Sequence, residues 1–268
     1  MQLALAAILF LNVPIGVGSS VFNPASDQCR TRAGQITRLI VPSIVYRQPI
    51  LVSVYLPPCY TSSANSLPVI YLLHGGGADE TQWPDLRVQA EADDLIANGA
   101  QPFVVVMPSG AYQVGIDYAA FVLDDLIPSV SDQLHLRTDS AGRAIGGISL
   151  GGYWALNIAF HHPDRFAATG GYSPVVASRT DDLVTLARTA TGLVRLRITL
   201  DVGDSDALVT GTQQLAKTLR ARELDVSFTA HSGGHNRSYW RSHTNNYLSF
   251  MLASFTSPAP RLTCRPER

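Results

Sequence analysis

The chain alternates between short apolar runs rich in β-branched residues and longer stretches with helical periodicity, and this alternation constrains the fold more than any other feature. The apolar runs cover 68–74, 102–108, 143–148, 194–202 and 225–231. The helical stretches cover 85–99, 119–134, 150–162, 210–224 and 237–252. Such strands and amphipathic helices in turn are typical of a mostly parallel sheet with helices on both faces. The predicted fold class is therefore α/β.

Length and composition favour a single compact domain. Of the 268 residues, 46% are hydrophobic and 15% are charged, which suits one large core. We expect this domain to cover residues 30–256 and the final segment, 257–268, to form an exposed tail. The formal net charge is -1 and no run of Lys or Arg forms a basic stripe, so we expect no nucleic-acid partner. No sequence feature indicates an oligomeric state.

The first eighteen residues, MQLALAAILFLNVPIGVG, carry no charge and precede the small pair Ser19 and Ser20. This pattern is typical of a secretory signal, so residues 1–20 are predicted to be an export signal and the protein is expected in the periplasm or outside the cell. The Lys or Arg usual near the start of such a signal is missing, and the alternative is a disordered or mis-started N-terminus. Pro14 and Gly16 interrupt the apolar stretch, which argues against a stable membrane span.

The three cysteines, Cys29, Cys59 and Cys264, are too few for a disulfide scaffold or a zinc knuckle. Export would permit one bridge. Segments 36–46 and 50–57 are predicted to be a strand pair, with Cys29 ahead of the first strand and Cys59 behind the second. We therefore hypothesise a Cys29–Cys59 disulfide.

A single serine stands among glycines in GGISLGGY, residues 146–153. Gly147, Ser149 and Gly151 form the pattern G-x-S-x-G. A strand that turns sharply into a helix with one side chain at the crest needs these glycines, because a β-carbon there would collide with neighbouring backbone. The apolar run before Ser149 and the helical stretch after it provide that setting, so Ser149 is predicted to be a catalytic nucleophile. The alternative is a glycine-rich turn that only packs a strand against a helix.

A catalytic serine hydroxyl needs a base within hydrogen-bond distance and a third group that orients the base. His235 is the best-placed base, because it follows two glycines in a loop after the last predicted strand. The acid comes before the histidine in α/β-hydrolases, which directs attention to the loop after the preceding strand. Asp204 and Asp206 both lie there, and one of them could instead cap the helix that begins near Val209. The other histidines are more simply explained as structural: His74, His135, His161, His162, His231 and His243.

Acyl transfer also requires hydrogen-bond donors for the developing oxyanion. Three glycines, Gly75–Gly77, follow the apolar run 68–74 directly, as in the HGGG turn of lipases and esterases. The backbone amide of Leu150, immediately after the nucleophile, would be the second donor. The alternative is that the glycines form only a flexible turn.

Several segments in register resemble the esterase family of α/β-hydrolases, which includes esterase D, feruloyl and acetyl xylan esterases, and mycolyltransferases of the antigen 85 type. They are VSVYLPPCY, LPVIYLLHGGGADETQW, FVLDDLIPSV, GRAIGGISLGGYWAL, HPDRFAATGGYSP, the GDSD loop and GGHNRSYW. The resemblance covers almost the whole chain after the predicted signal and implies an α/β-hydrolase fold.

The resemblance also implies roles for single residues. Ser149 would be the nucleophile, His235 the base, and the amides of Gly76 and Leu150 the oxyanion donors. The acid of this family usually stands three residues after a glycine, which selects Asp206 and leaves Asp204 in reserve. Trp83 matches a tryptophan that we expect to pack against the oxyanion turn rather than to contact substrate. Chemistry of this kind needs no metal or organic cofactor.

Two departures narrow the expected substrate. The serine motif reads G-I-S-L-G-G, whereas S-formylglutathione hydrolases of the family tend to have G-H-S-M-G-G, and an export signal disagrees with their cytosolic location. A mycolyltransferase would use a glutamate as its acid. We therefore predict a serine esterase for small acyl or carbohydrate esters of the acetyl or feruloyl type. The alternatives are an acyltransferase, a thioesterase, or an inert binding module.

Two segments, 109–121 and 173–192, are placed to border the site. Tyr112, Tyr118 and Tyr172 could stack there on a sugar or an aromatic acyl group, or they could be packing residues.

Overall fold

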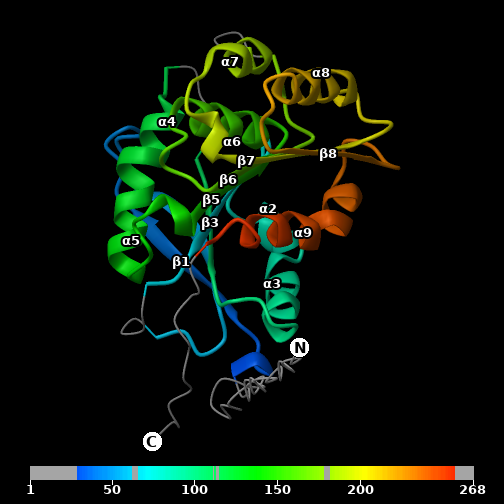
Figure 1. Ribbon diagram of the computed structural model, residues 1–268. Coiled ribbons are helices and arrows are strands. Elements are labelled where there is room, and N and C mark those ends of the chain that lie inside the picture. Colours follow the sequence, from blue (N-terminus) through cyan, green and yellow to red (C-terminus); the bar gives the residue numbers. More distant parts are fainter. Residues whose placement is uncertain (1–28, 62–65, 111, 113–114, 178–181, 257–268) are drawn as a thin grey trace, which may run out of the picture.

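The computed structural model describes residues 29–61, 66–110, 112, 115–177 and 182–256, and within them eight strands form one sheet (Figure 1). The strands are β1 (Gln35–Val41), β2 (Ile50–Leu56), β3 (Val69–Leu73), β4 (Val104–Pro108), β5 (Arg143–Ile148), β6 (Ala168–Tyr172), β7 (Arg197–Gly203) and β8 (Val226–His231). Their order is β1-β2-β4-β3-β5-β6-β7-β8. β2 pairs antiparallel with both β1 and β4, and the remaining neighbours are parallel. The α/β prediction is confirmed.

Helices connect the strands. The α-helices are α2 (Gln82–Asp85), α3 (Val88–Ala97), α4 (Tyr118–Ala120), α5 (Ile127–Leu134), α6 (Leu150–His161), α7 (Leu183–Thr189), α8 (Val209–Arg220) and α9 (Arg237–Leu252). A π-helix, η1 (Phe121–Leu126), joins α4 to α5, and two 3₁₀ turns are η2 (Ser140–Gly142) and η3 (Leu193–Arg195). The helix expected over 237–252 has those bounds. The one expected over 119–134 consists of three consecutive pieces, and Pro128 lies in the first turn of α5, directly after the π-helical turn.

Two hydrophobic clusters lie on opposite faces of the sheet. Val69, Tyr71 and Leu73 of β3 belong to one cluster, whereas Ile70 and Leu72 belong to the other, because successive side chains of a strand point to opposite faces. Helices α5, α6 and α8 contribute to the first cluster, and α3 and α9 to the second. Figure 1 shows α3 and α9 on one side of the sheet and α5, α6 and α8 on the other.

Two elements that the sequence pattern did not indicate are β6 and α7. β6 reads ATGGY and is fully buried, but two glycines and an alanine give it no β-branched run. It is a strand because β5 and β7 pair with it on either side. α7 begins after Asp182, whose side chain accepts a hydrogen bond from the Val184 amide.

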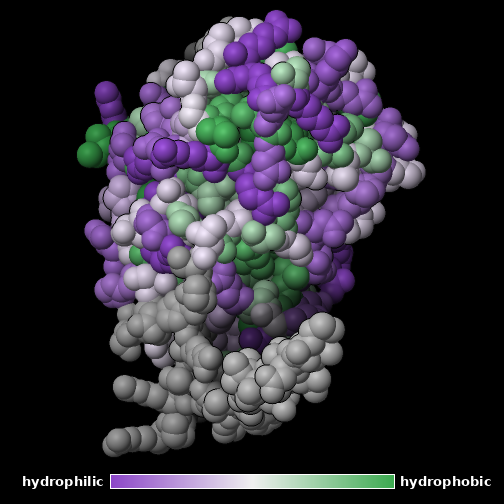
Figure 2. Space-filling model, in the orientation of Figure 1, coloured by the Kyte–Doolittle hydropathy of each residue, from purple (hydrophilic) through white to green (hydrophobic). Residues whose placement is uncertain are grey.

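Cys29 and Cys59 form a disulfide with their Cα atoms 5.6 Å apart, so the hypothesised pairing is confirmed. The predicted export signal, the predicted tail and Cys264 lie outside the described residues. Within the described ranges, no helix has both the length and the apolar character needed to cross a bilayer. On the face shown in Figure 2, hydrophilic and hydrophobic residues are intermixed.

Because the sheet is parallel from β4 to β8, the carboxyl ends of these strands lie along one edge. The loops that follow β3, β5, β7 and β8 at this edge carry the glycine turn, Ser149, the aspartates and His235.

Candidate active site

Ser149 occupies the sharp turn between β5 and α6. Its φ of 55° and ψ of -115° are rare for a residue with a side chain. A β-carbon on Gly147 would collide with the backbone of Gly151, and one on Gly151 with the carbonyl oxygen of His74. The two glycines therefore allow the turn to pack against β3, and the strained backbone holds the serine hydroxyl at the crest.

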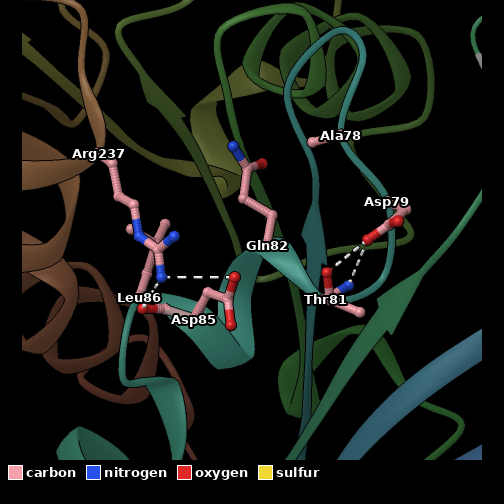
Figure 3. A pocket seen from close by; sticks show the side chains of 7 residues that line it. All are labelled: Ala78, Asp79, Thr81, Gln82, Asp85, Leu86 and Arg237. Atoms are coloured by element: carbon pink, nitrogen blue, oxygen red, sulfur yellow. Dashed lines mark hydrogen bonds and ion pairs between the residues drawn. The ribbon is translucent and has the colours of Figure 1, made fainter.

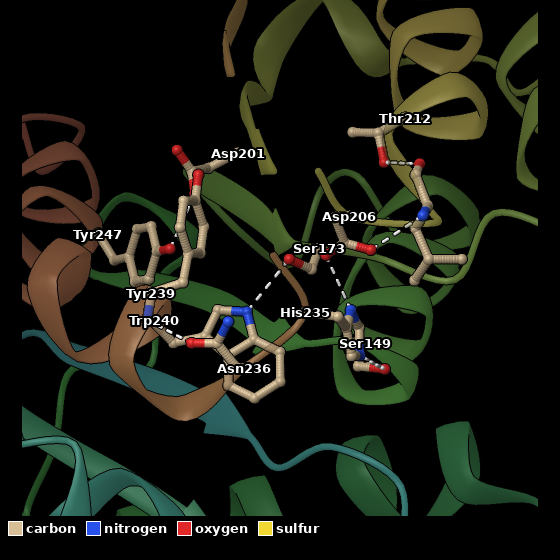
Figure 4. A network of polar contacts seen from close by, with 11 residues as sticks. Ser149, Ser173, Asp201, Asp206, Thr212, His235, Asn236, Tyr239, Trp240 and Tyr247 are labelled. Carbon is tan, nitrogen blue, oxygen red and sulfur yellow. Dashed lines mark hydrogen bonds and ion pairs between the residues drawn. The ribbon is translucent and has the colours of Figure 1, made fainter. Parts of the chain in front are cut away.

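His235 reaches Ser149 from the loop between β8 and α9. Its Nε2 lies 3.0 Å from Ser149 Oγ, and its Nδ1 lies 2.9 Å from Asp206 Oδ2 (Figure 4). The next residue, Asn236, caps α9 by accepting a hydrogen bond from the Tyr239 amide, so the start of the helix fixes where the loop ends. The three side chains come from loops far apart in the chain and form one hydrogen-bonded line.

The two candidate acids have different surroundings. The Asp206 side chain has no exposed surface, and its second oxygen, Oδ1, accepts a hydrogen bond from the Leu208 amide at 2.9 Å. Asp204 is exposed, and it accepts hydrogen bonds from the Gly233 amide and the Ser205 hydroxyl. Both hydrogen bonds lower the pKa of Asp204, and the one from the Gly233 amide has the larger effect. The structure brings Asp206, not Asp204, to His235.

Gly76 lies beside Leu150, at the start of α6. A β-carbon built on Gly76 would be 3.5 Å from Leu150 Cδ2. The neighbouring Gly75 amide donates instead to Gln82 Oε1 at 2.7 Å. Among the described residues, the amides of Gly76 and Leu150 have no hydrogen-bond acceptor. Neither amide is therefore committed to a hydrogen bond within the described part of the chain.

The buried ring of His74 stabilises the glycine turn that follows β3. Its Nδ1 lies 2.7 Å from the Gly75 carbonyl oxygen and its Nε2 lies 3.2 Å from that of Gly110. Burial is the main cause that lowers the pKa of His74, and the two backbone contacts oppose it. The Tyr112 hydroxyl donates to the His74 carbonyl oxygen. His74 is thus a loop-stabilising residue, as the sequence suggested.

The aromatic residues considered for substrate contact are mainly packing residues. Trp83 is 1% exposed and donates from Nε1 to the Leu73 carbonyl oxygen, so it packs under the turn as expected. Tyr118 and Tyr172 are also buried, and Tyr172 stacks on Tyr247 at 3.7 Å between ring centroids. Only Tyr112 of the three tyrosines is partly exposed. The packing explanation therefore holds for Tyr118 and Tyr172.

A second polar network, which the sequence pattern did not indicate, lies beside the site. The buried carboxylate of Asp201, at the end of β7, accepts hydrogen bonds from the hydroxyls of Tyr239 and Tyr247 of α9. Nearby, Trp240 Nε1 donates to Ser173 Oγ (Figure 4). Asp201 lies within the apolar run 194–202 of the sequence, and its partners become evident only when α9 packs on the sheet.

A polar pocket adjoins the glycine turn (Figure 3). It has a volume of about 270 Å³ and is lined by Ala78, Asp79, Thr81, Gln82, Asp85, Leu86 and Arg237. The Arg237 guanidinium, two residues beyond His235, donates to the Asp85 carbonyl oxygen and lies 3.4 Å from its carboxylate. Within the described part of the chain, no group of three or more His, Cys, Asp or Glu side chains is arranged to hold a metal ion.

Comparison with protein families gives a match over residues 43–251 to the family described as "Putative esterase". Among curated proteins, an endo-1,4-beta-xylanase/feruloyl esterase of Xylanibacter ruminicola is 34% identical over 137 residues, which are 44% of this chain and 18% of that protein. Esterase Rv1288 of Mycobacterium tuberculosis is 30% identical over 141 residues, 48% of this chain and 30% of that protein. The chain therefore spans less than a third of the length of these relatives.

Solved structures show the same fold. A ferulic acid esterase superposes with a TM-score of 0.78 at 23% identity, covering 84% of this chain and 99% of that one. An S-formylglutathione hydrolase from Staphylococcus aureus superposes with a TM-score of 0.68 at 20% identity, covering 82% and 98%. At these identities the similarity is one of fold.

Proposed function

The chain belongs to the esterase family matched over residues 43–251, and on this basis we propose that it is a serine carboxylic-ester hydrolase acting on small acyl or carbohydrate esters. The observation that carries the proposal is the hydrogen-bonded line from Ser149 Oγ through His235 to Asp206, with separations of 3.0 and 2.9 Å. These are distances over which a proton can be transferred along hydrogen bonds.

In the first half of the reaction, Ser149 Oγ attacks the ester carbonyl carbon while its proton passes to His235 Nε2. The Asp206 carboxylate stabilises the imidazolium and keeps Nδ1 protonated, so that Nε2 faces the serine as the base. The amides of Gly76 and Leu150 donate to the oxyanion of the tetrahedral intermediate. The intermediate collapses, the alcohol leaves with the proton from His235, and Ser149 remains acylated.

In the second half, a water molecule takes the place of the alcohol. His235 accepts a proton from it, the hydroxide attacks the acyl carbon, and collapse returns the proton to Ser149 Oγ as the free carboxylic acid leaves. The start of α6 adds to this chemistry, since the backbone N–H groups of a helix N-terminus favour negative charge.

Two observations favour a carbohydrate alcohol over glutathione. A curated relative, 34% identical over 137 residues, is described as an endo-1,4-beta-xylanase/feruloyl esterase. In addition, the pocket next to the glycine turn offers carboxylate, hydroxyl, amide and guanidinium groups, which suit the hydroxyls of a sugar. We propose that the alcohol portion of the ester contacts this pocket.

We also propose that the protein works outside the cytoplasm. The Cys29–Cys59 disulfide supports this, because such bonds form and persist mainly in oxidising compartments. The uncharged N-terminal stretch supports it independently.

The function is tested with p-nitrophenyl acetate, methyl ferulate, acetylated xylan and S-formylglutathione as substrates. Ser149→Ala is expected to lower kcat by about 10⁴-fold or more. A fluorophosphonate should label the wild-type protein covalently and leave Ser149→Ala unlabelled. Retention of most activity by Ser149→Ala would overturn the assignment of the nucleophile, and an unlabelled, inactive wild type would indicate an inert binding module. Product analysis with an added sugar acceptor distinguishes hydrolysis from acyl transfer.

A further inference from the structure

The segment that leaves β6, residues 172–175, holds the nucleophile from both sides. The Ser149 amide donates to the Tyr172 carbonyl oxygen at 2.9 Å, and the Val175 amide donates to the Ser149 carbonyl oxygen at 3.1 Å. The backbone of Ser149 is therefore held by this segment as well as by β5 and α6.

The same segment contacts the helix that follows His235. Ser173 Oγ accepts a hydrogen bond from Trp240 Nε1 at 3.1 Å, and both residues are buried (Figure 4). The Trp240 ring packs against the imidazole of His235, with 4.9 Å between ring centroids and 86° between ring planes. A continuous series of contacts thus leads from the backbone of the nucleophile to the ring of the base.

Ser173 itself is firmly held. Its side chain has no exposed surface, and its φ is 49°. A positive φ is uncommon for a residue with a side chain and persists where the surroundings enforce it. Its amide donates to the Asp201 carbonyl oxygen at 2.6 Å. The Asp201 carboxylate in turn accepts from Tyr239 and Tyr247. The strand ends of β6 and β7 and the start of α9 are joined at this point.

The His235 ring needs such support. Its side chain is 35% exposed, and it lies in a loop behind two glycines. The hydrogen bond from Nδ1 to Asp206 fixes one point of the ring, but it permits the ring to rotate about that bond. A second ring packed against the imidazole removes this freedom, so that Nε2 stays directed at Ser149 Oγ.

We infer that Ser173 and Trp240 are positioning residues for the reaction: the Ser173 hydroxyl holds the Trp240 indole, and the indole holds the imidazole of His235 in line with Ser149. This inference rests on the proposed function. Neither residue touches the reacting atoms, and both act through His235.

The test compares Ser173→Gly, Ser173→Ala, Trp240→Phe and the double variant Ser173→Gly/Trp240→Phe in hydrolysis of p-nitrophenyl acetate. Each single variant is expected to lose about 10- to 100-fold in kcat with KM unchanged, as small misplacements of catalytic groups do. The rate of fluorophosphonate labelling should fall in parallel. The double variant should lose no more than the worse single one, because both substitutions break the same series of contacts.

Two comparisons separate positioning from general loss of stability. Ser173→Gly relieves the positive φ and Ser173→Ala does not, so their Tm values should differ while their kcat values fall equally. Ser254→Ala is the matched control, since Ser254 is also a buried, hydrogen-bonded serine but lies beyond the end of α9. It should lower Tm and leave kcat unchanged.

Three results would overturn the inference: wild-type kcat in a folded Trp240→Phe or Ser173→Gly variant, a loss expressed only in KM, or losses that multiply in the double variant. Trp240→Phe keeps an aromatic ring in the same cavity and carries the test should the Ser173 variants fail to fold. Failure of the proposed function is recognised separately, because in that case the wild-type protein itself would neither hydrolyse the ester nor be labelled.

Discussion

Replacing Asp206 by Asn probes the acid that orients His235, and the structure indicates why this small change should be severe. Each carboxylate oxygen accepts a hydrogen bond from an N–H group: Oδ2 from His235 Nδ1 and Oδ1 from the Leu208 amide, both at 2.9 Å. An asparagine side chain has only one acceptor oxygen. With its oxygen toward Leu208, its NH₂ faces Nδ1 and forces the proton of the ring onto Nε2, where the base is needed.

The opposite orientation of the amide is no better, because its NH₂ would then face the Leu208 N–H in a site with no exposed surface. Two buried donors facing each other cost about 1–3 kcal/mol, which favours the orientation with the wrong tautomer. We expect kcat to fall about 10⁴-fold with KM nearly unchanged. At about 1.36 kcal/mol per tenfold, the activation free energy rises by roughly 5.5 kcal/mol.

The assay is the initial rate of p-nitrophenyl acetate hydrolysis at pH 7.5, with Asp204→Asn as the matched control. Asp204 lies two residues away in the same loop, is exposed, and its carboxylate accepts hydrogen bonds from Ser205 and Gly233 rather than from His235. Its variant should keep kcat within about twofold, since surface changes rarely disturb a site. The reasoning is refuted if Asp206→Asn stays within tenfold of the wild type or if Asp204→Asn loses as much.

Two further perturbations test the frame of the site. The Cys29–Cys59 bond joins positions 30 residues apart, so Cys59→Ser should lower the free energy of unfolding in urea by about 3.6 kcal/mol. An unchanged unfolding midpoint, or full alkylation of the native protein without reductant, would contradict this. Burial lowers the pKa of His74 from its ordinary value of 6.5, so its contribution to stability is complete above that pH and is lost as pH falls toward the folded-state pKa. Between pH 7 and pH 5, the free energy of unfolding should therefore fall less for His74→Gln than for the wild type. The difference between the two proteins should grow by up to about 1.4 kcal/mol per pH unit. Equal losses of the two proteins in urea titrations would exclude the effect.

The sequence predicted the architecture where local pattern and tertiary environment agree. β3 and β4 are buried on both faces, so their apolar runs are continuous and easily recognised. α9 has the expected bounds because Asn236 ends the preceding loop with a side-chain cap. The π-helical turn within 119–134 was not predictable, since such a turn is decided by packing rather than by the periodicity of the sequence.

For the site, chain order and glycine spacing were sufficient to select Ser149 and His235, but the residues by themselves left the acid open between Asp204 and Asp206. Both are aspartates in one short loop, and spacing contains no information on which side chain is buried. Asp206 differs because the turn after β7 directs it inward, where two N–H donors meet it. Burial of this kind depends on β8 and α9, which come later in the chain.

β6, which the sequence pattern did not indicate, leads into the segment 172–175. This segment hydrogen-bonds to the backbone of Ser149 and, through Trp240, contacts the ring of His235. β6 contains Gly170 and Gly171. A β-carbon on Gly170 would crowd Tyr172 and Met251, and one on Gly171 would crowd Leu156 and Pro174. Packing against α6 on one face and α9 on the other therefore requires glycines, and glycines remove the signal by which a strand is recognised. Because α6 and α9 pack closely on β6, the segment that follows this strand, residues 172–175, contacts both Ser149 and Trp240. A larger side chain at Gly171 would meet Leu156 of α6 and Pro174, and α6 begins at the residue after the nucleophile.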